Sequence, residues 1–165
     1  MLFPGTVLVF KILLLLVLAN GAPVVVKKLF GPRLAYPLDA GKKFIDGQPL
    51  FGTSKTIRGI IASILTTSMG ALLIGYSMQT GLLFATASLT GDLASSFVKR
   101  RLNLPPSSRA LGLDQLPESI FPLLLCWQSL GLDIVTAATV VVIFFVGELL
   151  LSKLLFRLNI RDHPY

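Results

Sequence analysis

The chain has 165 residues, of which 53% are hydrophobic and 14% charged, and its mean hydropathy is +0.78. Soluble domains carry about 25% charged residues, so this composition excludes an ordinary soluble protein and indicates a membrane protein. Fifteen Lys and Arg against eight Asp and Glu give a net charge of +7. Because the cations lie between apolar segments, we expect anionic lipid headgroups or phosphorylated substrates as partners, and no nucleic acid.

Long apolar segments follow one another along the whole chain. A helix needs about 20 apolar residues to cross a bilayer, and the sequence predicts five such helices, near residues 2–26, 57–78, 82–98, 117–132 and 134–155. The expected fold is therefore an all-α integral membrane protein with a single domain over 1–165. Cytoplasmic loops are expected near 27–56 and 99–116, and together they would form the functional site. The fourth segment is the weakest, because it is short and contains Pro122 and Gln128.

The distribution of cations predicts the orientation in the membrane. Every lysine and arginine except Lys11 lies in 27–58, in 99–109 or in the tail from 153 onward. Basic loops favour the cytoplasmic side, and five crossings place all three regions there. We expect a multi-pass protein of the cell (plasma) membrane with an outer amino terminus and a site facing the cytoplasm. A cleaved signal peptide is disfavoured, because the leading residues are not basic and cleavage would leave Lys27 and Lys28 outside.

The segment LDAGKKFIDGQPLFGTSKTIRG, Leu38–Gly59, is rich in Gly, Lys and Asp and leads directly into the second predicted helix. Glycines let backbone N–H groups approach an anion, and a helix N-terminus adds unpaired donors and the positive end of a dipole. Lys42, Lys43, Lys55 and Arg58 add formal charge, so the segment favours a polyphosphate ligand. A loop anchored to anionic lipid is the alternative, which explains the lysines but not the aspartates or the glycines.

Asp92 lies within the third predicted helix, about two turns before its basic end. A carboxylate at that depth is costly unless it pairs with a cation or binds a metal, so Asp92 is a candidate functional residue. A structural ion pair with Lys99 or Arg100 is the alternative. Polar residues at spacings of three and four form one stripe on this helix: Ser88, Asp92, Ser95 or Ser96, and Lys99.

Asp114 stands at the entrance of the fourth predicted helix, in GLDQLPES. Mg²⁺ takes one or two carboxylates together with substrate phosphate and water, so Asp92 and Asp114 are expected to share one ion. A carboxylate that only complements the helix dipole is the alternative. Glu148 is interpreted as an ion-pair partner or as lining the cavity. His163, the single histidine, lies in the tail, so acid–base catalysis by histidine is not expected.

Three motifs, in this order, resemble the membrane CTP:phosphatidate cytidylyltransferase superfamily. They are KTIRG at Lys55–Gly59, GDLASSFVKR at Gly91–Arg100 and LDQL at Leu113–Leu116. The short chain and the leader PLDAGKKFIDGQPLFG are similar to its archaeal branch, the CDP-archaeol synthases. Two features depart from the pattern: the His-Gly-Gly element of bacterial relatives is absent, and Pro117 replaces an expected acid, with Glu118 one position late.

The resemblance implies transfer of CMP from CTP to the phosphate of an unsaturated archaeal ether lipid, digeranylgeranylglyceryl phosphate, with release of pyrophosphate. It implies Mg²⁺ on Asp92 and Asp114, and catalytic roles for these two residues and for Lys55 and Lys99. The expected substrate-binding residues are Lys42, Lys43, Asp46, Gly52, Thr53, Ser54, Lys55, Thr56, Gly59, Ser95, Ser96, Lys99, Arg100 and Gln115.

Three other functions are weighed against this one. A small transporter or ion carrier would use Asp92 and Glu148 as intramembrane ion sites, but it would not need the glycine-rich basic loop. A membrane scaffold would need neither buried carboxylate. A CDP-alcohol phosphotransferase is disfavoured, because Asp46 and Gly47 are not followed by the Ala-Arg of that enzyme type.

Overall fold

The computed structural model describes residues 4–108 and 110–157, with side chains described from 5 to 151 within these ranges. The regular elements are α1 (Pro4–Phe30), α2 (Ile57–Leu73), α3 (Met78–Arg101), α4 (Gln115–Leu125), α5 (Trp127–Leu130) and α6 (Ile134–Arg157). The prediction of an all-α fold is confirmed for this part of the chain. Arg161 and His163, two residues of the tail, lie outside the described residues.

Several helices have the length and apolarity of membrane spans. Three meet both requirements: α1 over Gly5–Phe30, α3, and α6 over Ile134–Leu151. The apolar helix α2 is shorter, with 17 residues. α4 and α5 follow one another with a break at Cys126, whose N–H donates to the carbonyl of Pro122. The chain is thus a membrane protein, while the five crossings and the outer amino terminus stay predictions.

Several helix boundaries differ from the predicted ones: α1 continues to Phe30, past the predicted end at 26, and α4 begins at Gln115 rather than 117. The turn expected near Gln79 lies earlier, between Leu73 and Met78, because the hydroxyl of Ser77 accepts a hydrogen bond from the N–H of Thr80 and caps α3. At its other end α3 continues to Arg101. The cations expected at the start of a loop therefore lie on the last helical turn, where they complement the helix dipole.

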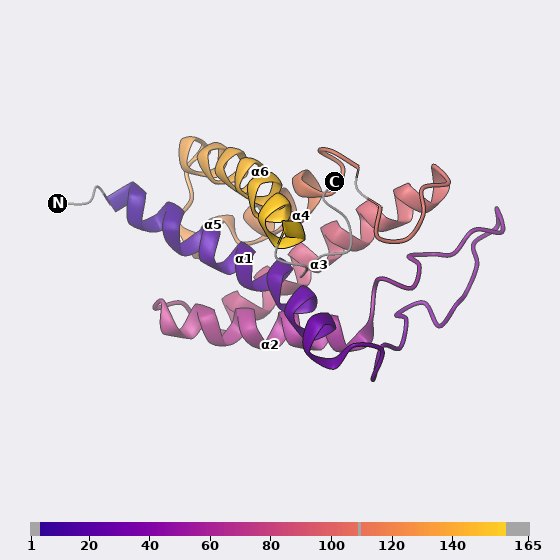
Figure 1. Ribbon diagram of the computed structural model, residues 1–165. Helices are drawn as coiled ribbons and strands as arrows, with labels where there is room; N and C mark the ends of the chain where they lie inside the picture. The colour runs from indigo at the N-terminus through magenta and orange to yellow at the C-terminus, as the bar shows by residue number, and fades with distance from the viewer. Residues whose placement is uncertain (1–3, 109, 158–165) are drawn as a thin grey trace.

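Close packing of small residues joins the first three helices. A Cβ atom added to Gly81 of α3 would lie 2.6 Å from the Cα atom of Ser68 and 2.7 Å from the Cβ atom of Ala71, both on α2. The hydroxyl of Ser63 on α2 donates to the carbonyl of Ala19 on α1, at 2.7 Å. Figure 1 shows α1 running between α2 and α6. Small side chains thus let the helix backbones approach, as in other membrane bundles.

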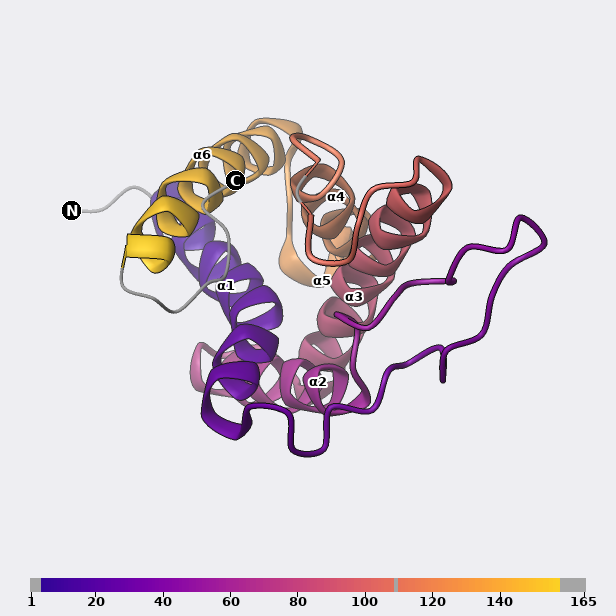
Figure 2. The same cartoon turned by 45° about the vertical axis from the view of Figure 1, so that its right-hand side comes forward.

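The helix ends that carry the sequence motifs meet at one end of the bundle. Arg58, in the first turn of α2, donates to the carbonyls of Gly31 and Arg33 just beyond α1. Near the C-terminal end of α3, the hydroxyl of Ser95 donates to the carbonyl of Leu113 at 2.5 Å. Leu113 directly precedes the start of α4. The long segment between α1 and α2 extends from this end of the bundle (Figure 2). We call this end the motif end.

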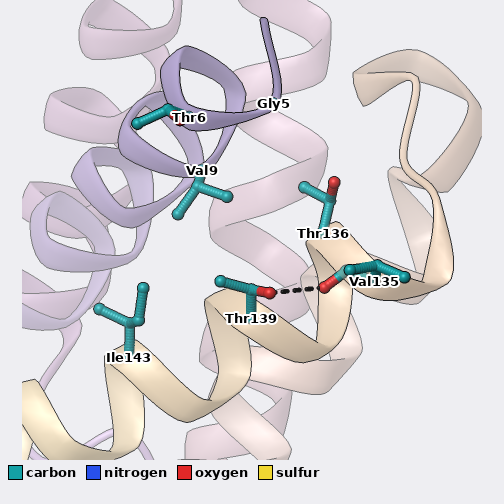
Figure 3. Close-up of a pocket in the computed structure, with 7 residues that line it drawn as sticks. All are labelled: Gly5, Thr6, Val9, Val135, Thr136, Thr139 and Ile143. Carbon is teal, nitrogen blue, oxygen red and sulfur yellow. Dashed lines mark hydrogen bonds between the residues drawn. The ribbon is translucent and has the colours of Figure 1, made fainter. Parts of the chain in front are cut away.

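A cavity of about 380 Å³ lies at the opposite end, between the first turns of α1 and α6 (Figure 3). Gly5 and Thr6 face Val135 and Thr136 across it. The hydroxyl of Thr139 is bonded to the carbonyl of Val135 at 2.7 Å, so the lining is mainly hydrocarbon. Among the residues that the structure describes, none that lines this cavity is charged, which distinguishes it from the polar motif end.

The packing of α3 against α2 gives a first testable prediction. Gly81→Ala should lower the stability of the folded protein by about 1–3 kcal/mol, because the added methyl group would overlap backbone and side chain of α2. The thermal unfolding midpoint in detergent micelles measures this effect. Gly21→Ala on α1 is the matched control, since its Cβ atom would meet nothing within 4 Å. Equal midpoints for both variants would contradict the packing argument.

Candidate active site

An ion pair joins the loop before α2 to the middle of α3. The ammonium group of Lys55 lies 2.6 Å from each carboxylate oxygen of Asp92. The two side chains are 23% and 24% exposed, so the pair is partly shielded from water. Asp92 therefore pairs with neither Lys99 nor Arg100, the partners of the structural alternative. One candidate catalytic lysine and one candidate metal ligand are in direct contact.

A second ion pair joins the end of α3 to the start of α4. The ammonium group of Lys99 lies 2.6 Å from a carboxylate oxygen of Asp114 and donates to the carbonyl of Ser108 at 2.9 Å. The other carboxylate oxygen of Asp114 accepts from the N–H of Ala110 at 3.1 Å. Gln115 is 1% exposed, and its side-chain oxygen accepts from the N–H of Gly112 at 2.9 Å. These bonds fix the segment before α4 against α3.

Glu118 is a third carboxyl group in this region, and it lies one helical turn after Asp114. It is 6% exposed, and its carboxyl interacts electrostatically with Asp92, Glu148, Lys55 and Asp114. The close approach of α3 and α4 brings it there. A Cβ atom on Gly91 would overlap the backbone of Pro117 and lie 2.7 Å from the nitrogen of Glu118. Gly91 therefore allows the close packing of α3 on α4.

Asp39 organises the loop that carries Lys55. One of its carboxylate oxygens accepts from the N–H groups of Phe51 and Gly52, at 3.0 and 2.9 Å, and the other from Gly41 at 3.0 Å. Burial acts to raise the pKa of Asp39, but these backbone donors outweigh it and hold the pKa below its ordinary value of 3.8. The loop therefore closes around an ionised carboxylate.

Arg101 ties the outer part of the same loop to α3. Its guanidinium lies 4.9 Å from the ring centroid of Phe44 and 4.6 Å from that of Phe97, and it pairs with Asp46 at 2.5 Å. Asp46, expected to bind substrate, is thus engaged with Arg101. Gln48 adds a hydrogen bond to the side chain of Asn103, at 2.9 Å.

The KTIRG motif begins α2 as expected of a capped helix. The hydroxyl of Thr56 accepts from the N–H of Gly59 at 3.3 Å. Gly59 also packs on α1, because a Cβ atom there would lie 3.2 Å from the Cβ atom of Pro23. Thr53 and Ser54 are exposed beside Lys55, so their polar groups are open to a ligand.

Some residues expected at the site lie away from the two ion pairs. Lys42 and Lys43 are exposed, and no hydrogen bond or ion pair joins their side chains to another described residue. The guanidinium of Arg58 is occupied by carbonyls beyond α1. Ser95, in contrast, lies between the two pairs, because its hydroxyl donates to the carbonyls of Gly91 and Leu113, which directly precede Asp92 and Asp114. Ser96 is buried on the same helix.

The residues that sequence reasoning missed are those whose role depends on contacts across the fold. The sequence patterns assign no function to Asp39 or Glu118. They also give no sign that Lys55 pairs with Asp92, which lies 37 positions away. The spacing between Ser88 and Ser95 indicated a polar face of α3, but not what it meets. The hydroxyl of Ser88 donates to the backbone carbonyl of Glu118 at 3.0 Å.

The carboxylates fit Mg²⁺ in type and number. Asp92 and Asp114 offer hard oxygen donors, and Mg²⁺ commonly takes one or two carboxylates with substrate phosphate and water. Among residues 5–151 with described side chains, no group of three or more His, Cys, Asp or Glu forms a metal site. Both aspartates are paired with lysines, so a shared ion stays a prediction.

A double-mutant cycle tests the pair between α3 and the loop. Lys55→Gln and Asp92→Asn should each destabilise the protein, because each leaves a partly buried charge without its partner. The double variant should recover stability, with a coupling energy of about 0.5–3 kcal/mol. Unfolding midpoints in detergent measure it. Lys11→Gln is the control, since its ammonium lies 5.4 Å from the Tyr76 ring, near the opposite end of α1. Additive effects at Lys55 and Asp92 would contradict the pairing.

The lowered pKa of Asp39 predicts how the loop responds to acid. A carboxyl whose pKa falls on folding contributes stability above its unfolded pKa, and this is lost as pH falls through the folded pKa. Hydrogen exchange at Phe51 and Gly52, corrected for intrinsic rates, should show constant protection from pH 7 to about 4 and loss below it. Asp39→Asn should lower protection by about tenfold or more at neutral pH. Asp133→Asn, in the turn before α6, is the control and should leave protection at Phe51 and Gly52 unchanged. Unchanged protection in Asp39→Asn would refute the role of Asp39 as the acceptor that closes the loop.

Comparisons with known proteins show to which family the chain belongs. Residues 6–165 match the family described as CarS-like, CDP-archaeol synthase. The CDP-archaeol synthase of Sulfurisphaera tokodaii is 33% identical over 153 residues, covering 89% of each chain. That of Thermofilum pendens is 34% identical over 155 residues, covering 89% of this chain and 75% of the relative. That of Pyrobaculum calidifontis is 39% identical over 132 residues, covering 74% and 76%.

A solved structure has the same fold. It is described as an intramembrane enzyme for archaeal membrane lipids biosynthesis, and it superposes with a TM-score of 0.66 at 28% sequence identity. The match covers 84% of this chain and 91% of that one. The resemblance inferred from KTIRG, GDLASSFVKR and LDQL is confirmed. The chain is an enzyme, a cytidylyltransferase of archaeal membrane lipid synthesis, and it belongs to the CDP-archaeol synthase family.

Proposed function

We propose that this protein transfers CMP from CTP to the phosphate of digeranylgeranylglyceryl phosphate in a Mg²⁺-dependent reaction, giving an unsaturated CDP-archaeol and pyrophosphate. The active site lies at the motif end and faces the cytoplasm, where CTP is available. The observation that carries the proposal is the pairing of Lys55 with Asp92 and of Lys99 with Asp114. These contacts bring the three motifs, far apart in sequence, to one place.

The nucleophile needs little activation from the protein. A phosphate monoester has a second pKa near 6, so the lipid phosphate is largely ionised at neutral pH and requires no base to remove a proton. The obstacle to reaction is the electrostatic repulsion between the lipid phosphate and the triphosphate of CTP. A site rich in fixed cations lowers that repulsion, and positioning with electrostatic stabilisation is the main source of catalysis in phosphoryl-type transfers.

The two lysines change partners when substrate binds. In the protein described here, the ammonium of Lys55 is held by Asp92 and that of Lys99 by Asp114. An incoming phosphate competes for the same donors, and each lysine that turns to a phosphate leaves a carboxylate free. The four side chains are therefore preorganised for the substrate: the two lysines bind phosphate oxygens, and the two aspartates bind a metal ion.

Asp92 and Asp114 would hold the magnesium ion, with Glu118 near enough to influence it electrostatically. When bound, Mg²⁺ neutralises charge on the α-phosphate and on the departing pyrophosphate. Thr53, Ser54 and the turn from Gly52 to Lys55 border the same region and present hydroxyl and backbone donors to the nucleotide. The apolar exterior of the bundle accommodates the isoprenoid chains, while the lipid headgroup reaches the motif end.

Transfer of label from α-labelled CTP into an organic-extractable product tests the proposal. Purified protein with Mg²⁺ should label digeranylgeranylglyceryl phosphate, and EDTA should stop the reaction. A diacyl phosphatidic acid supplied in parallel tests the lipid preference, and the proposal predicts label in the ether lipid only. Label in both lipids would remove the specificity for ether lipids. No label in either, from folded protein, would contradict the proposed reaction and favour an ion carrier.

Variants of the paired aspartate sharpen this test. Asp92→Asn should lower kcat/KM by at least about 100-fold, as expected when charge stabilisation at the reacting centre is removed. Asp133→Asn is the matched control, because Asp133 bonds Thr136 in the turn before α6, at the end opposite the motifs. Unchanged turnover in Asp92→Asn would exclude Asp92 from the metal site.

A further inference from the structure

The depth of Asp92 in the bundle determines how far a lipid substrate must enter it. Asp92 precedes Arg101, the last residue of α3, by about 13 Å along the helix axis. A lipid phosphate that attacks a nucleotide beside Asp92 must descend by a similar distance. Lipid chains of one leaflet fill about half of a hydrocarbon core that is about 30 Å thick. The chains of a lipid that has descended this far therefore extend past the middle of the bilayer.

The cavity between α1 and α6 lies in the half of the bundle that these chain ends reach. On α6 it is lined from Val135 to Ile143, which is within about 14 Å of the start of that helix at Ile134. Because α6 has 24 residues, its midpoint is about 18 Å from its start. The cavity therefore lies beyond the middle of the helix, on the side away from the motif end.

The lining of the cavity suits hydrocarbon and offers little to a polar ligand. Val9 of α1 and Ile143 of α6 face each other across the space (Figure 3). The hydroxyls of Thr136 and Thr139 are already bonded, to the carboxylate of Asp133 at 2.5 Å and to a backbone carbonyl at 2.7 Å. A water molecule takes up about 30 Å³ in the liquid, so a cavity of about 380 Å³ has room for several isoprenoid carbons.

An exposed face of α6 connects the cavity with the motif end. Gly147 and Leu150 continue the spacing of three and four residues that begins with Thr136, Thr139 and Ile143, so all five lie on one face of the helix. A Cβ atom added to Gly147 would meet nothing within 4 Å, and Leu150 is 63% exposed. A hydrocarbon chain can therefore follow this face into the cavity.

This face begins at the depth of the candidate active site. Leu150 lies about 24 Å from the start of α6, and Asp92 lies about 21 Å from the start of α3; both helices start at the end opposite the motifs. Glu148 of α6 interacts electrostatically with Glu118, which also interacts with Asp92. The same turns of α6 thus border the site and lead away from it.

We infer that the cavity between α1 and α6 receives the end of one isoprenoid chain of the lipid substrate, and that Thr139 and Ile143 select for chain length there. This inference rests on the proposed function and locates one part of its lipid substrate. A short chain ends before the cavity and leaves it unfilled. Because lipid is as apolar as the cavity, the preference for a long chain comes from packing rather than from the hydrophobic effect.

The KM values of two lipid phosphates measure this selection in full-length protein. Digeranylgeranylglyceryl phosphate and digeranylglyceryl phosphate share a headgroup, but the chains of the second are half as long. Thr139→Phe fills the cavity and should raise the KM of the long-chain lipid about tenfold, as expected when groups are forced into a filled space. The KM values of the short-chain lipid and of CTP should not change.

Ala138→Phe is the matched control, because Ala138 is exposed on α6 but does not line the cavity. It should alter the KM of neither lipid. Equal changes for both lipids in Thr139→Phe, or no change for either, would contradict the selection for chain length.

Photo-crosslinking tests the same site in wild-type protein without turnover. Digeranylgeranylglyceryl phosphate with a diazirine at the end of one chain should attach to residues 5–9 of α1 or 135–143 of α6, and excess unlabelled lipid phosphate should suppress this. Attachment only to other segments would overturn the inference. Equal suppression by the same diether without its phosphate would also overturn it, because the cavity would then hold any membrane lipid. Crosslinks in the cavity without CMP transfer would refute the proposed function but leave the chain site standing.

Discussion

The ion pair between Lys55 and Asp92 is the interaction on which the rest of the site depends. It joins a loop outside the helices to a carboxylate within α3, at 2.6 Å to both oxygens. Without a cation, a carboxylate at that position is costly in an apolar bundle. Without Asp92, the loop lysine would lack a fixed position near the membrane. The same pair therefore holds the loop against α3 in the resting protein, and under the proposed function it would supply one cation for a phosphate and one carboxylate for the metal ion.

The loop between α1 and α2 is held in place by polar contacts and by Arg101 of α3 rather than by a hydrophobic core. Asp39 accepts hydrogen bonds from three backbone N–H groups of the loop, and Arg101 pairs with Asp46 and lies over the rings of Phe44 in the loop and Phe97 on α3. Such bonds order a glycine-rich segment before any ligand arrives, which reduces the entropy lost on binding.

Much of this arrangement is predictable from the sequence, because hydrophobic runs, basic loops and local motifs are local properties. The all-α membrane fold and the start of α2 at Ile57 follow from such patterns. Contacts between distant segments do not. Nothing in the spacing of residues shows that Lys55 pairs with Asp92, that Asp39 closes its own loop, or that Arg100 is buried. Pro122 and the break at Cys126 likewise obscured how α4 and α5 divide the fourth apolar segment.

The exchange of partners by the two lysines is the central claim, and one experimental structure tests it most directly. The protein would be determined with Mg²⁺ and a CTP analogue that cannot be cleaved between its α- and β-phosphates. The account predicts that the ammonium of Lys55 leaves Asp92 for a phosphate oxygen and that Asp92 and Asp114 contact the ion. An intact Lys55–Asp92 pair with the nucleotide bound elsewhere would contradict it.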